Sequence, residues 1–391
     1  GADGGDGAGD HAWLARAGGG ALGRRWDRRG LCPLRTSPTK GLRASGHRYL
    51  VSGGRADSSA TLPAWAARIA SCVFNEHSQE TMAALAKIII ASRESRLAMW
   101  QAVHVQGRLA ALNPDSPVDI LGMTTRGDQI LDRPLAEIGG KGLFTKELEQ
   151  EMLSGGIDIA VHSLKDMPTV LPEGLILAAI TKRVDPGDAL VAPTYKTLDD
   201  LPHGAKIGTS SLRRKAQLLS YRPDLQISDL RGNVDTRLNK LISENLDGIV
   251  LAAAGLKRLG WEEKITQIIP QQICLPAVGQ GALAIETRAD DTVMHELLAF
   301  LNNTDSFYAT TGERAFLRTV EGGCQVPVGV YGTVENDLLE LEAVIATVDG
   351  KTIIRDKIKG ETKTAEFLGE ELARKMLAAG GLKIMTDLGC M

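Results

Sequence analysis

From residue 87 onward, short runs of β-branched and other apolar residues alternate with longer stretches in which apolar residues recur every three or four positions. The first run, 87–91, leads through a polar loop into a helical pattern over 96–112. Further strands are predicted at 118–123, 157–161, 206–208, 227–230, 248–252 and 283–286. Phe144, Leu148 and Met152 fall four residues apart, as they would on one face of a helix. Strands that alternate with helices indicate an α/β fold.

Two segments rich in Pro and Gly, 182–187 and 275–281, interrupt this series. They predict two doubly wound lobes joined by a hinge of two crossings, with the strand at 283–286 returning to the first lobe. The first lobe is expected to comprise 85–181 plus 282–300, and the second 187–275. Ligands of such sheets bind outside the carboxyl ends of the strands, so the cleft between the lobes is the expected site.

The last part of the chain, 304–391, has a different pattern. A helix through Thr319 leads to a turn at Cys324, and meander strands are predicted at 339–347 and 351–359. A final amphipathic helix, predicted to stop at Gly380-Gly381, has an inner face made of Phe367, Leu368, Leu372 and Met376. We therefore expect a small third domain of the α+β type.

The first 81 residues are rich in Gly, Ala and Arg and keep no helical or strand period, so they are predicted to be disordered. The patterned region begins near Met82, so an upstream translation artefact explains this extension at least as well as a targeting segment. Its aspartates are atypical of transit peptides. We expect a cytoplasmic protein, or a plastid protein if residues 1–81 are a transit peptide.

Composition narrows the classes of function. The formal net charge of −3 argues against broad nucleic-acid binding. No apolar run approaches the roughly 20 residues that cross a bilayer, which argues against a membrane role. The five cysteines are scattered without CxxC or Cys/His spacing, which indicates a reducing compartment and no metal site. A monomer is the expected state.

Basic residues gather at predicted loop-to-helix junctions. The arginines in question are Arg93, Arg213, Arg214, Arg231, Arg237 and Arg258. Any one of them could be a solvated helix-end cation, but the set predicts a polyanionic ligand, because the planar guanidinium pairs with both oxygens of a carboxylate. The segment 139–142 lacks the frame of a P-loop, and 279–284 precedes a strand instead of joining a strand to a helix, which disfavours dinucleotide binding.

Two further residues are candidates for chemistry. Cys324 follows Gly322-Gly323, and glycines allow backbone conformations that let the thiol project outward; the alternative is a buried free cysteine. Asp166 stands beside Lys165, past the end of the strand at 157–161, where a carboxylate can stabilise developing positive charge; the alternative is a surface Lys–Asp pair.

Nine segments together resemble the porphobilinogen deaminases, also called hydroxymethylbilane synthases. In chain order they are RES with LAMWQ (93–101), TRGD (125–128), GGKGLF (139–144), HSLKDMP (162–168), GTSSLRR (208–214), LRGNV (230–234), AGLKRLG (254–260), LPAVGQG (275–281) and EGGCQVP (321–327). The resemblance runs from about Met82 to the C-terminus. One difference is Arg96, where many members carry Pro or a neutral residue.

The resemblance implies that Cys324 holds a dipyrromethane cofactor through a thioether. On it, four porphobilinogen molecules are deaminated and joined, and water releases hydroxymethylbilane for tetrapyrrole biosynthesis. Asp166 would contact pyrrole N–H groups and stabilise the cation formed as ammonia leaves. The six arginines would bind the carboxylates of cofactor and substrate. Hydrogen bonds would come from Ser95, Ser163, Lys165, Thr209, Ser211 and Gln280.

The predicted fold class is thus α/β, with two hinged, doubly wound lobes of the periplasmic-binding-protein-like type and a small C-terminal α+β domain. Two competing functions share parts of the pattern. A two-lobed anion-binding protein would share the fold and the arginines but needs no Gly-Gly-Cys loop. A phosphate-handling transferase would use helix-start arginines but should show metal-binding acids near a P-loop.

Overall fold

The computed structural model describes residues 87–129, 142–320 and 326–389. The predicted N-terminal extension, 1–81, and Cys324 lie outside these ranges. The predictions made for them are therefore not tested by the fold.

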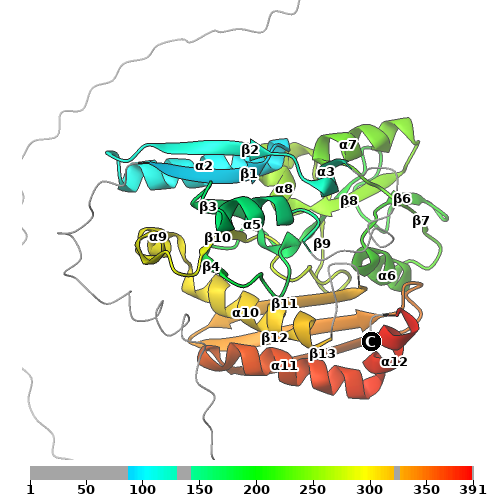
Figure 1. Cartoon of the computed structure of the whole chain (residues 1–391). Coiled ribbons are helices and arrows are strands. Elements are labelled where there is room, and N and C mark those ends of the chain that lie inside the picture. Colours follow the sequence, from blue (N-terminus) through cyan, green and yellow to red (C-terminus); the bar gives the residue numbers. More distant parts are fainter. Residues whose placement is uncertain (1–86, 130–141, 321–325, 390–391) are drawn as a thin grey trace, which may run out of the picture. The chain divides into compact units, whose positions relative to one another are not determined.

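The first sheet has five strands in the order β2-β1-β3-β10-β4 (Figure 1). They are β1 (Ile88–Arg93), β2 (Val118–Met123), β3 (Ile159–Ser163), β4 (Leu175–Ile180) and β10 (Leu283–Arg288). β1 runs parallel to β2 and β3, while β10 is antiparallel to β3 and β4. The strand predicted at 283–286 thus returns to this sheet.

Helices cover both faces of the first sheet. Successive strand residues point to opposite faces, and Ile90 packs into the cluster that includes Val105 of α2 (Arg96–Leu112). Its neighbour Ala91 packs with Leu148 of α5 (Lys146–Leu153). α9 (Thr292–Leu298) joins the α2 side. A short helix, α3 (Arg126–Gln129), follows β2.

The second sheet repeats this arrangement, in the order β7-β6-β8-β5-β9. Its strands are β5 (Asp188–Val191), β6 (Lys206–Gly208), β7 (Gln226–Ser228), β8 (Gly248–Ala252) and β9 (Gln267–Ile269). β5 is antiparallel to β8 and β9 and takes the place that β10 has in the first sheet. The helices are α6 (Leu212–Tyr221), α7 (Val234–Ser243) and α8 (Ala253–Arg258). Both sheets are of the predicted doubly wound type.

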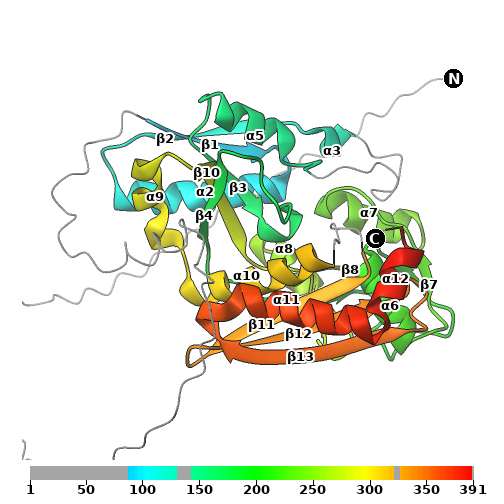
Figure 2. The same ribbon diagram turned by 60° about the horizontal axis from the view of Figure 1, so that its bottom comes forward.

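The C-terminal part has its own sheet and core. β11 (Val328–Glu335), β12 (Leu338–Ala346) and β13 (Ile353–Glu361) form an antiparallel meander. α10 (Thr304–Thr319) and α11 (Ala365–Met376) pack on it, and Figure 2 shows α11 lying along the sheet. Phe316, Leu341 and Leu372 are fully buried there. The predicted fold class is confirmed, whereas the residue limits of the three domains stay a prediction.

Local predictions fail at three places. Phe144 lies in a turn before α5 and not on the helix. Phe367 is 58% exposed, because it is one position away from the buried 368, 372 and 376 positions of α11. The helix that starts with α11 does stop at Gly380-Gly381, where Gly380 takes a φ of 114°, but it is not the final helix, because α12 (Leu382–Asp387) follows. The sequence prediction missed this short helix.

Candidate active site

A cavity of about 460 Å³ lies where residues of both sheets meet. The first sheet contributes the loop after β1 and the turn after β3, and the second contributes the loops before α7 and around α8. Six cationic side chains line it: Arg93, Lys165, Arg214, Arg231, Arg237 and Arg258. Three carboxylates also line it: Glu94, Asp128 and Asp166. This surplus of positive charge suits an anionic ligand.

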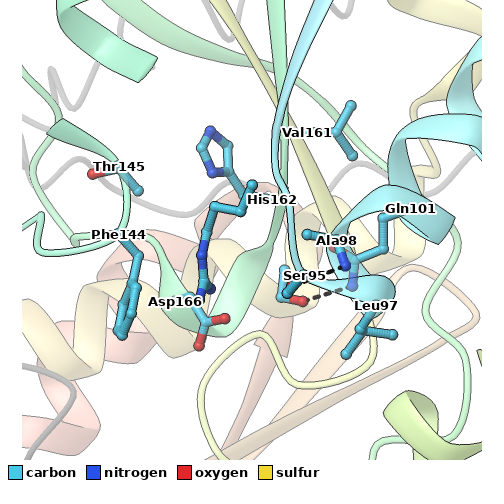
Figure 3. Close-up of a pocket in the computed structure, with 11 residues that line it drawn as sticks. Ser95, Leu97, Ala98, Gln101, Phe144, Thr145, Val161, His162 and Asp166 are labelled. Atoms are coloured by element: carbon cyan, nitrogen blue, oxygen red, sulfur yellow. Dashed lines mark hydrogen bonds between the residues drawn. The ribbon is translucent and has the colours of Figure 1, made fainter. Parts of the chain in front are cut away.

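Asp166 is positioned by the turn that follows β3. A short 3-10 helix, Leu164–Asp166, is anchored by the buried Leu164 side chain and leaves the Asp166 carboxylate exposed to the cavity. Next to it, burial lowers the pKa of Lys165 to about 8, an effect that the charge of Asp166 opposes. Ser163 accepts a hydrogen bond from Gln101 Nε2 at 2.9 Å, which fixes the end of β3 to α2 (Figure 3).

The charge of Arg93 is partly neutralised by Asp128. Its Nε donates to both oxygens of Asp128 at 3.1 Å, and its guanidinium lies 4.3 Å from the centre of the Phe144 ring. Burial raises the pKa of Asp128, but hydrogen bonds from Arg93 and Thr125 outweigh it, so this pKa lies below its ordinary value. Ser95 caps α2 by accepting from Ala98 N at 3.4 Å. No role was predicted from the sequence for Asp128 or Phe144.

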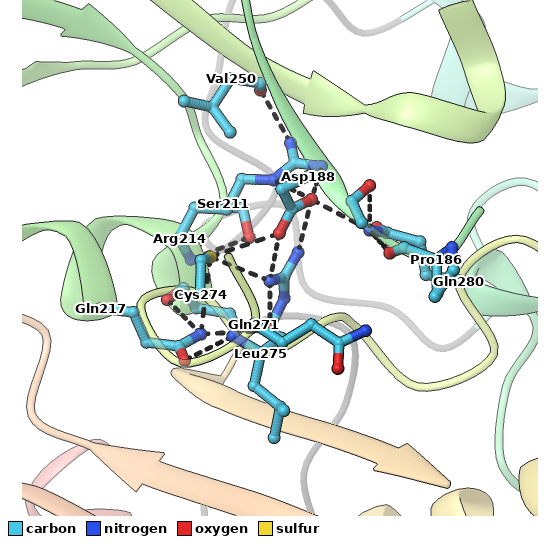
Figure 4. Close-up of polar contacts among 12 residues, drawn as sticks. Pro186, Asp188, Ser211, Arg214, Gln217, Val250, Gln271, Cys274, Leu275 and Gln280 are labelled. Atoms are coloured by element: carbon cyan, nitrogen blue, oxygen red, sulfur yellow. Dashed lines mark hydrogen bonds and ion pairs between the residues drawn. The ribbon is translucent and has the colours of Figure 1, made fainter. Parts of the chain in front are cut away.

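Arg213 and Arg214 both bind Asp188 (Figure 4). Arg213 Nη1 lies 2.6 Å from Asp188 Oδ2 and donates to the Leu275 carbonyl, while Arg214 Nη2 lies 2.7 Å from Asp188 Oδ1 and its Nη1 donates to the Val250 carbonyl. Burial raises the pKa of Asp188, but the two guanidiniums outweigh it and hold this pKa well below its ordinary value. Arg213 is only 4% exposed and does not line the cavity.

The start of α6 is satisfied by its own side chains. Ser211 Oγ accepts from Arg214 N at 3.5 Å, and Thr209 Oγ1 accepts from Ser211 N at 3.3 Å. Neither Thr209 nor Ser211 lines the cavity. The start of α6, where two of the predicted ligand-binding arginines lie, is therefore capped from within.

Arg231, Arg237 and Arg258 have no such partner. Within the described part of the chain, no carboxylate lies at ion-pair distance from any of them. Arg237 Nε donates to the Gly232 carbonyl and Arg258 Nη2 to the Gly281 carbonyl, both at 2.8 Å. Burial, chiefly, lowers the pKa of Arg237 and of Arg258 to about 10, so both stay charged at neutral pH. Arg231 Nη1 is buried and makes no hydrogen bond to a described residue.

The two halves of the cavity are also tied to each other. Gln280 Nε2 donates to the Pro186 carbonyl at 2.6 Å, which joins the two crossings, and its buried Oε1 has no described partner. At the start of α2, the Arg96 guanidinium lies 4.8 Å from the centre of the Trp261 ring and 3.4 Å from Asp235 Oδ1. Arg96 thus connects the first lobe to the second.

Ten of the predicted site residues meet at this cavity. They are Arg93, Ser95, Ser163, Lys165, Asp166, Arg214, Arg231, Arg237, Arg258 and Gln280. Thr209, Ser211 and Arg213 do not reach it, and Cys324 lies outside the described residues. Their roles stay predictions. Among the described residues, no group of His, Cys, Asp or Glu is placed to hold a metal ion. None of the described helices has the length and apolar character needed to cross a membrane.

Similarity to known proteins covers most of the chain. A solved structure, the periplasmic aliphatic sulphonate binding protein SsuA from Escherichia coli, matches with a TM-score of 0.33 and 14% identity over 60% of this chain and 71% of its own. The porphobilinogen deaminase of Desulforamulus reducens is 55% identical over 302 residues, 77% of this chain and 98% of its own. That of Pelotomaculum thermopropionicum is also 55% identical, over 76% of this chain and 96% of its own.

Two family models match in sequence order. The one described as porphobilinogen deaminase, dipyromethane cofactor binding domain, matches residues 88–296. The one described as porphobilinogen deaminase, C-terminal domain, matches residues 307–378. Both α/β sheets and the C-terminal meander fall within these matches. The chain therefore belongs to the porphobilinogen deaminase family.

Proposed function

We propose that this member of the family deaminates four porphobilinogen molecules and joins them head to tail on a covalent dipyrromethane primer. Water then releases hydroxymethylbilane. One observation carries the proposal: Arg231, Arg237 and Arg258, which lack a described carboxylate partner, share one cavity with the exposed carboxylate of Asp166. The arginines suit the acid side chains of the pyrroles, and Asp166 suits a cation on the ring.

The cavity fits a primer and substrate that carry several carboxylates. Arg231 Nη1 and Gln280 Oε1 are buried polar atoms with no described partner, and such atoms are costly unless a ligand or water satisfies them. When bound, the dipyrromethane supplies the pyrrole carbon to which the first substrate is joined. We assign its carboxylates to Arg231, Arg237 and Arg258, and hydrogen bonds to Ser95, Ser163, Lys165 and Gln280.

We assign the covalent attachment to Cys324. The chain on either side of it is well anchored, since Val320 and Val326 are both buried in the core of the C-terminal sheet. α10, which leads toward Cys324, also donates from Arg314 Nη2 to the Pro168 carbonyl at 2.7 Å, two residues beyond Asp166. A thioether suits this position because it resists hydrolysis and so keeps the primer while the product is cut away.

In this proposal Asp166 stabilises the positive charge that develops on the substrate. As ammonia leaves the substrate, positive charge develops on the pyrrole, and a fixed carboxylate beside the ring N–H stabilises it. The arginines hold the acid side chains and so orient the ring. Arg93 and Arg214 support the site while paired with Asp128 and Asp188.

We assign Arg213, Thr209 and Ser211 to holding the start of α6, because their described hydrogen bonds are made within the fold. We further propose that the chain acts as a monomer in the cytoplasm, in line with the reducing compartment that its scattered cysteines predict.

A turnover assay tests this function. The wild-type chain should release one ammonia for each porphobilinogen consumed and form a linear tetrapyrrole. Asp166→Asn should fold normally and turn over at least about 10²-fold more slowly. Asp290→Asn, which replaces an exposed aspartate outside the cavity, is the matched control and should behave as wild type. Failure of the wild-type chain to consume porphobilinogen would overturn the function, and normal turnover by Asp166→Asn would remove Asp166 from it.

A further inference from the structure

Behind Asp166 lies a buried cluster of three ionisable side chains that the proposed chemistry does not use. His162 of β3 opposes Ala284 of β10 and Glu286 opposes Ala160, so both side chains point to the face of the sheet that α5 covers. His162 Nε2 lies 3.1 Å from Glu286 Oε2. Glu149 of α5 completes the cluster, and His162, Glu286 and Glu149 are 6%, 0% and 6% exposed.

A small cavity of about 60 Å³ connects this cluster with Asp166. His162, Thr145 and Asp166 all line it, together with Arg93 and Ser163, which also line the large cavity (Figure 3). Polar residues such as Ser163 and Thr145 line it beside apolar ones such as Val161, and its volume is enough for a few water molecules. It therefore joins His162 to the reaction site.

The cluster also has unused hydrogen-bonding capacity. Thr145 Oγ1, Glu149 Oε1 and Glu286 Oε1 are buried, and none has a hydrogen-bond partner among the described residues. Buried polar oxygens in this condition are rare and point to a bound water, an ion or a catalytic role. These three leave acceptors for water or for a proton close to one imidazole.

The proposed reaction releases one proton per coupling. Porphobilinogen enters with a protonated amine, and the C–N bond breaks so that ammonia leaves with the electron pair. A carbon–carbon bond forms, and the ring carbon that forms it loses its hydrogen as a proton. Six cationic side chains and three carboxylates line the large cavity, so an additional proton is less favourable there than beside carboxylates alone. A group with carboxylates around it is better placed to take the proton up.

We propose that His162 relays this proton. It passes from the site at Asp166 through the small cavity to Nδ1 of His162, whose Nε2–H donates to Glu286. It returns to the departing ammonia or to water, so each cycle yields one ammonium overall. This inference rests on the proposed function. His162 does not touch the substrate, so it acts through Asp166 and water.

The charges around His162 agree with this role. Glu286 and Glu149 face it from the sheet and from α5, and Arg93 and Asp166 face the small cavity beside it. Burial, chiefly, raises the pKa of Glu149; Glu286 and Glu147 raise it further, while Thr145 and His162 lower it. His162 is therefore flanked by a carboxyl group of the sheet and by one of α5.

The first test replaces His162 with a side chain of similar volume that cannot take up a proton. His162→Gln keeps a donor to Glu286 but cannot titrate, so we expect kcat to fall at least about 10-fold and the acid limb of the pH–rate profile to disappear. The intact mass should still show the primer. Added imidazole should restore part of the rate of His162→Ala. Glu151→Gln, on the same helix and outside the cluster, should keep the wild-type profile.

The second test does not depend on turnover or on removal of the histidine. In the holoenzyme, NMR titration of the His162 ring should give a midpoint that moves to lower pH in Glu149→Gln, because removal of a nearby carboxylate disfavours the imidazolium. This variant decides the matter if His162→Gln fails to fold. An unchanged midpoint, or a folded His162→Gln with wild-type kcat and pH profile, overturns the relay. A wild-type chain that does not consume porphobilinogen overturns the proposed function instead.

Discussion

Two sets of arginines lie in the second lobe but have different partners. Arg213 and Arg214 share the buried carboxylate of Asp188, whereas Arg231, Arg237 and Arg258 have no described carboxylate within ion-pair distance. Arg213 and Arg214 lie in the first turn of α6, Arg231 precedes α7, Arg237 lies in the first turn of α7, and Arg258 ends α8. The presence of a carboxylate partner therefore separates arginines that hold the fold from arginines free to bind a ligand.

The difference in pairing predicts different effects on folding stability and on ligand binding. A buried charge is tolerated when it is paired and hydrogen-bonded, and removal of one partner leaves the other uncompensated. The second set keeps its charge beside a cavity, where ligand carboxylates can supply the missing partner. One set should thus affect folding and the other binding.

The largest effect is expected when the paired set loses its carboxylate. Asp188→Asn leaves two buried guanidiniums without a counter-charge and should lower the free energy of unfolding by about 3–5 kcal/mol. Urea titration against Asp290→Asn measures it. Because the pKa of Asp188 is depressed, its contribution is present above the ordinary aspartate pKa and is lost as pH falls. A loss of less than about 1 kcal/mol, a typical surface value, would remove the distinction between the sets.

A smaller and different effect is expected in the unpaired set. Arg237→Gln should lower kcat/KM by roughly 10- to 100-fold, because a charged hydrogen bond to a ligand carboxylate is worth about 1.5–3 kcal/mol. The free energy of unfolding should stay the same or rise, since an unpaired cation is removed. Arg374→Gln, on the exposed side of α11, is the control. Strong destabilisation by Arg237→Gln would place Arg237 with the structural pair.

The pH dependence of KM tests the role of Lys165 in the same cavity. Its pKa of about 8 means that the ammonium present at pH 7 is largely neutral by pH 9, so KM for porphobilinogen should rise over this range. Lys165→Met should have a higher KM at pH 7 and no such rise. Steady-state measurement of KM across the range decides it, and a flat wild-type KM would contradict the assignment.

The smallest effect is expected at Arg96, whose side chain is 61% exposed. Its contacts with Trp261 and Asp235 across the lobes should together contribute about 1 kcal/mol or less. Arg96→Gln should therefore change KM by no more than about fivefold, with an effect that shrinks at high salt. A double-mutant cycle with Trp261→Leu isolates the contact. A change above about tenfold would show that Arg96 does more than join the lobes.

Much of the fold could be predicted from the sequence, because the spacing of apolar residues along a helix or a strand is a local property. The helix at 96–112 and the strands at 118–123 and 248–252 have their predicted bounds. The return of β10 to the first sheet was also predicted. Phe367 shows the limit, because an aromatic residue one position off the buried stripe looks the same in sequence. Phe144 shows another, because it keeps the four-residue spacing but lies in the turn before α5 begins.

The site was predicted as a set of residue types but not as a set of contacts. Asp188 lies 25 residues from Arg213, and Asp128 lies 35 residues from Arg93, so no local spacing links them. His162 and Glu286, 124 residues apart, meet only because β3 and β10 pair. Which arginines are paired is decided by this long-range packing.

The intact mass of the purified chain tests the central claim most directly. We predict a mass that exceeds the sequence mass by two linked pyrrole units, and a Cys324→Ser variant that lacks this addition and is inactive. A wild-type chain of unmodified mass that is fully active would contradict the account.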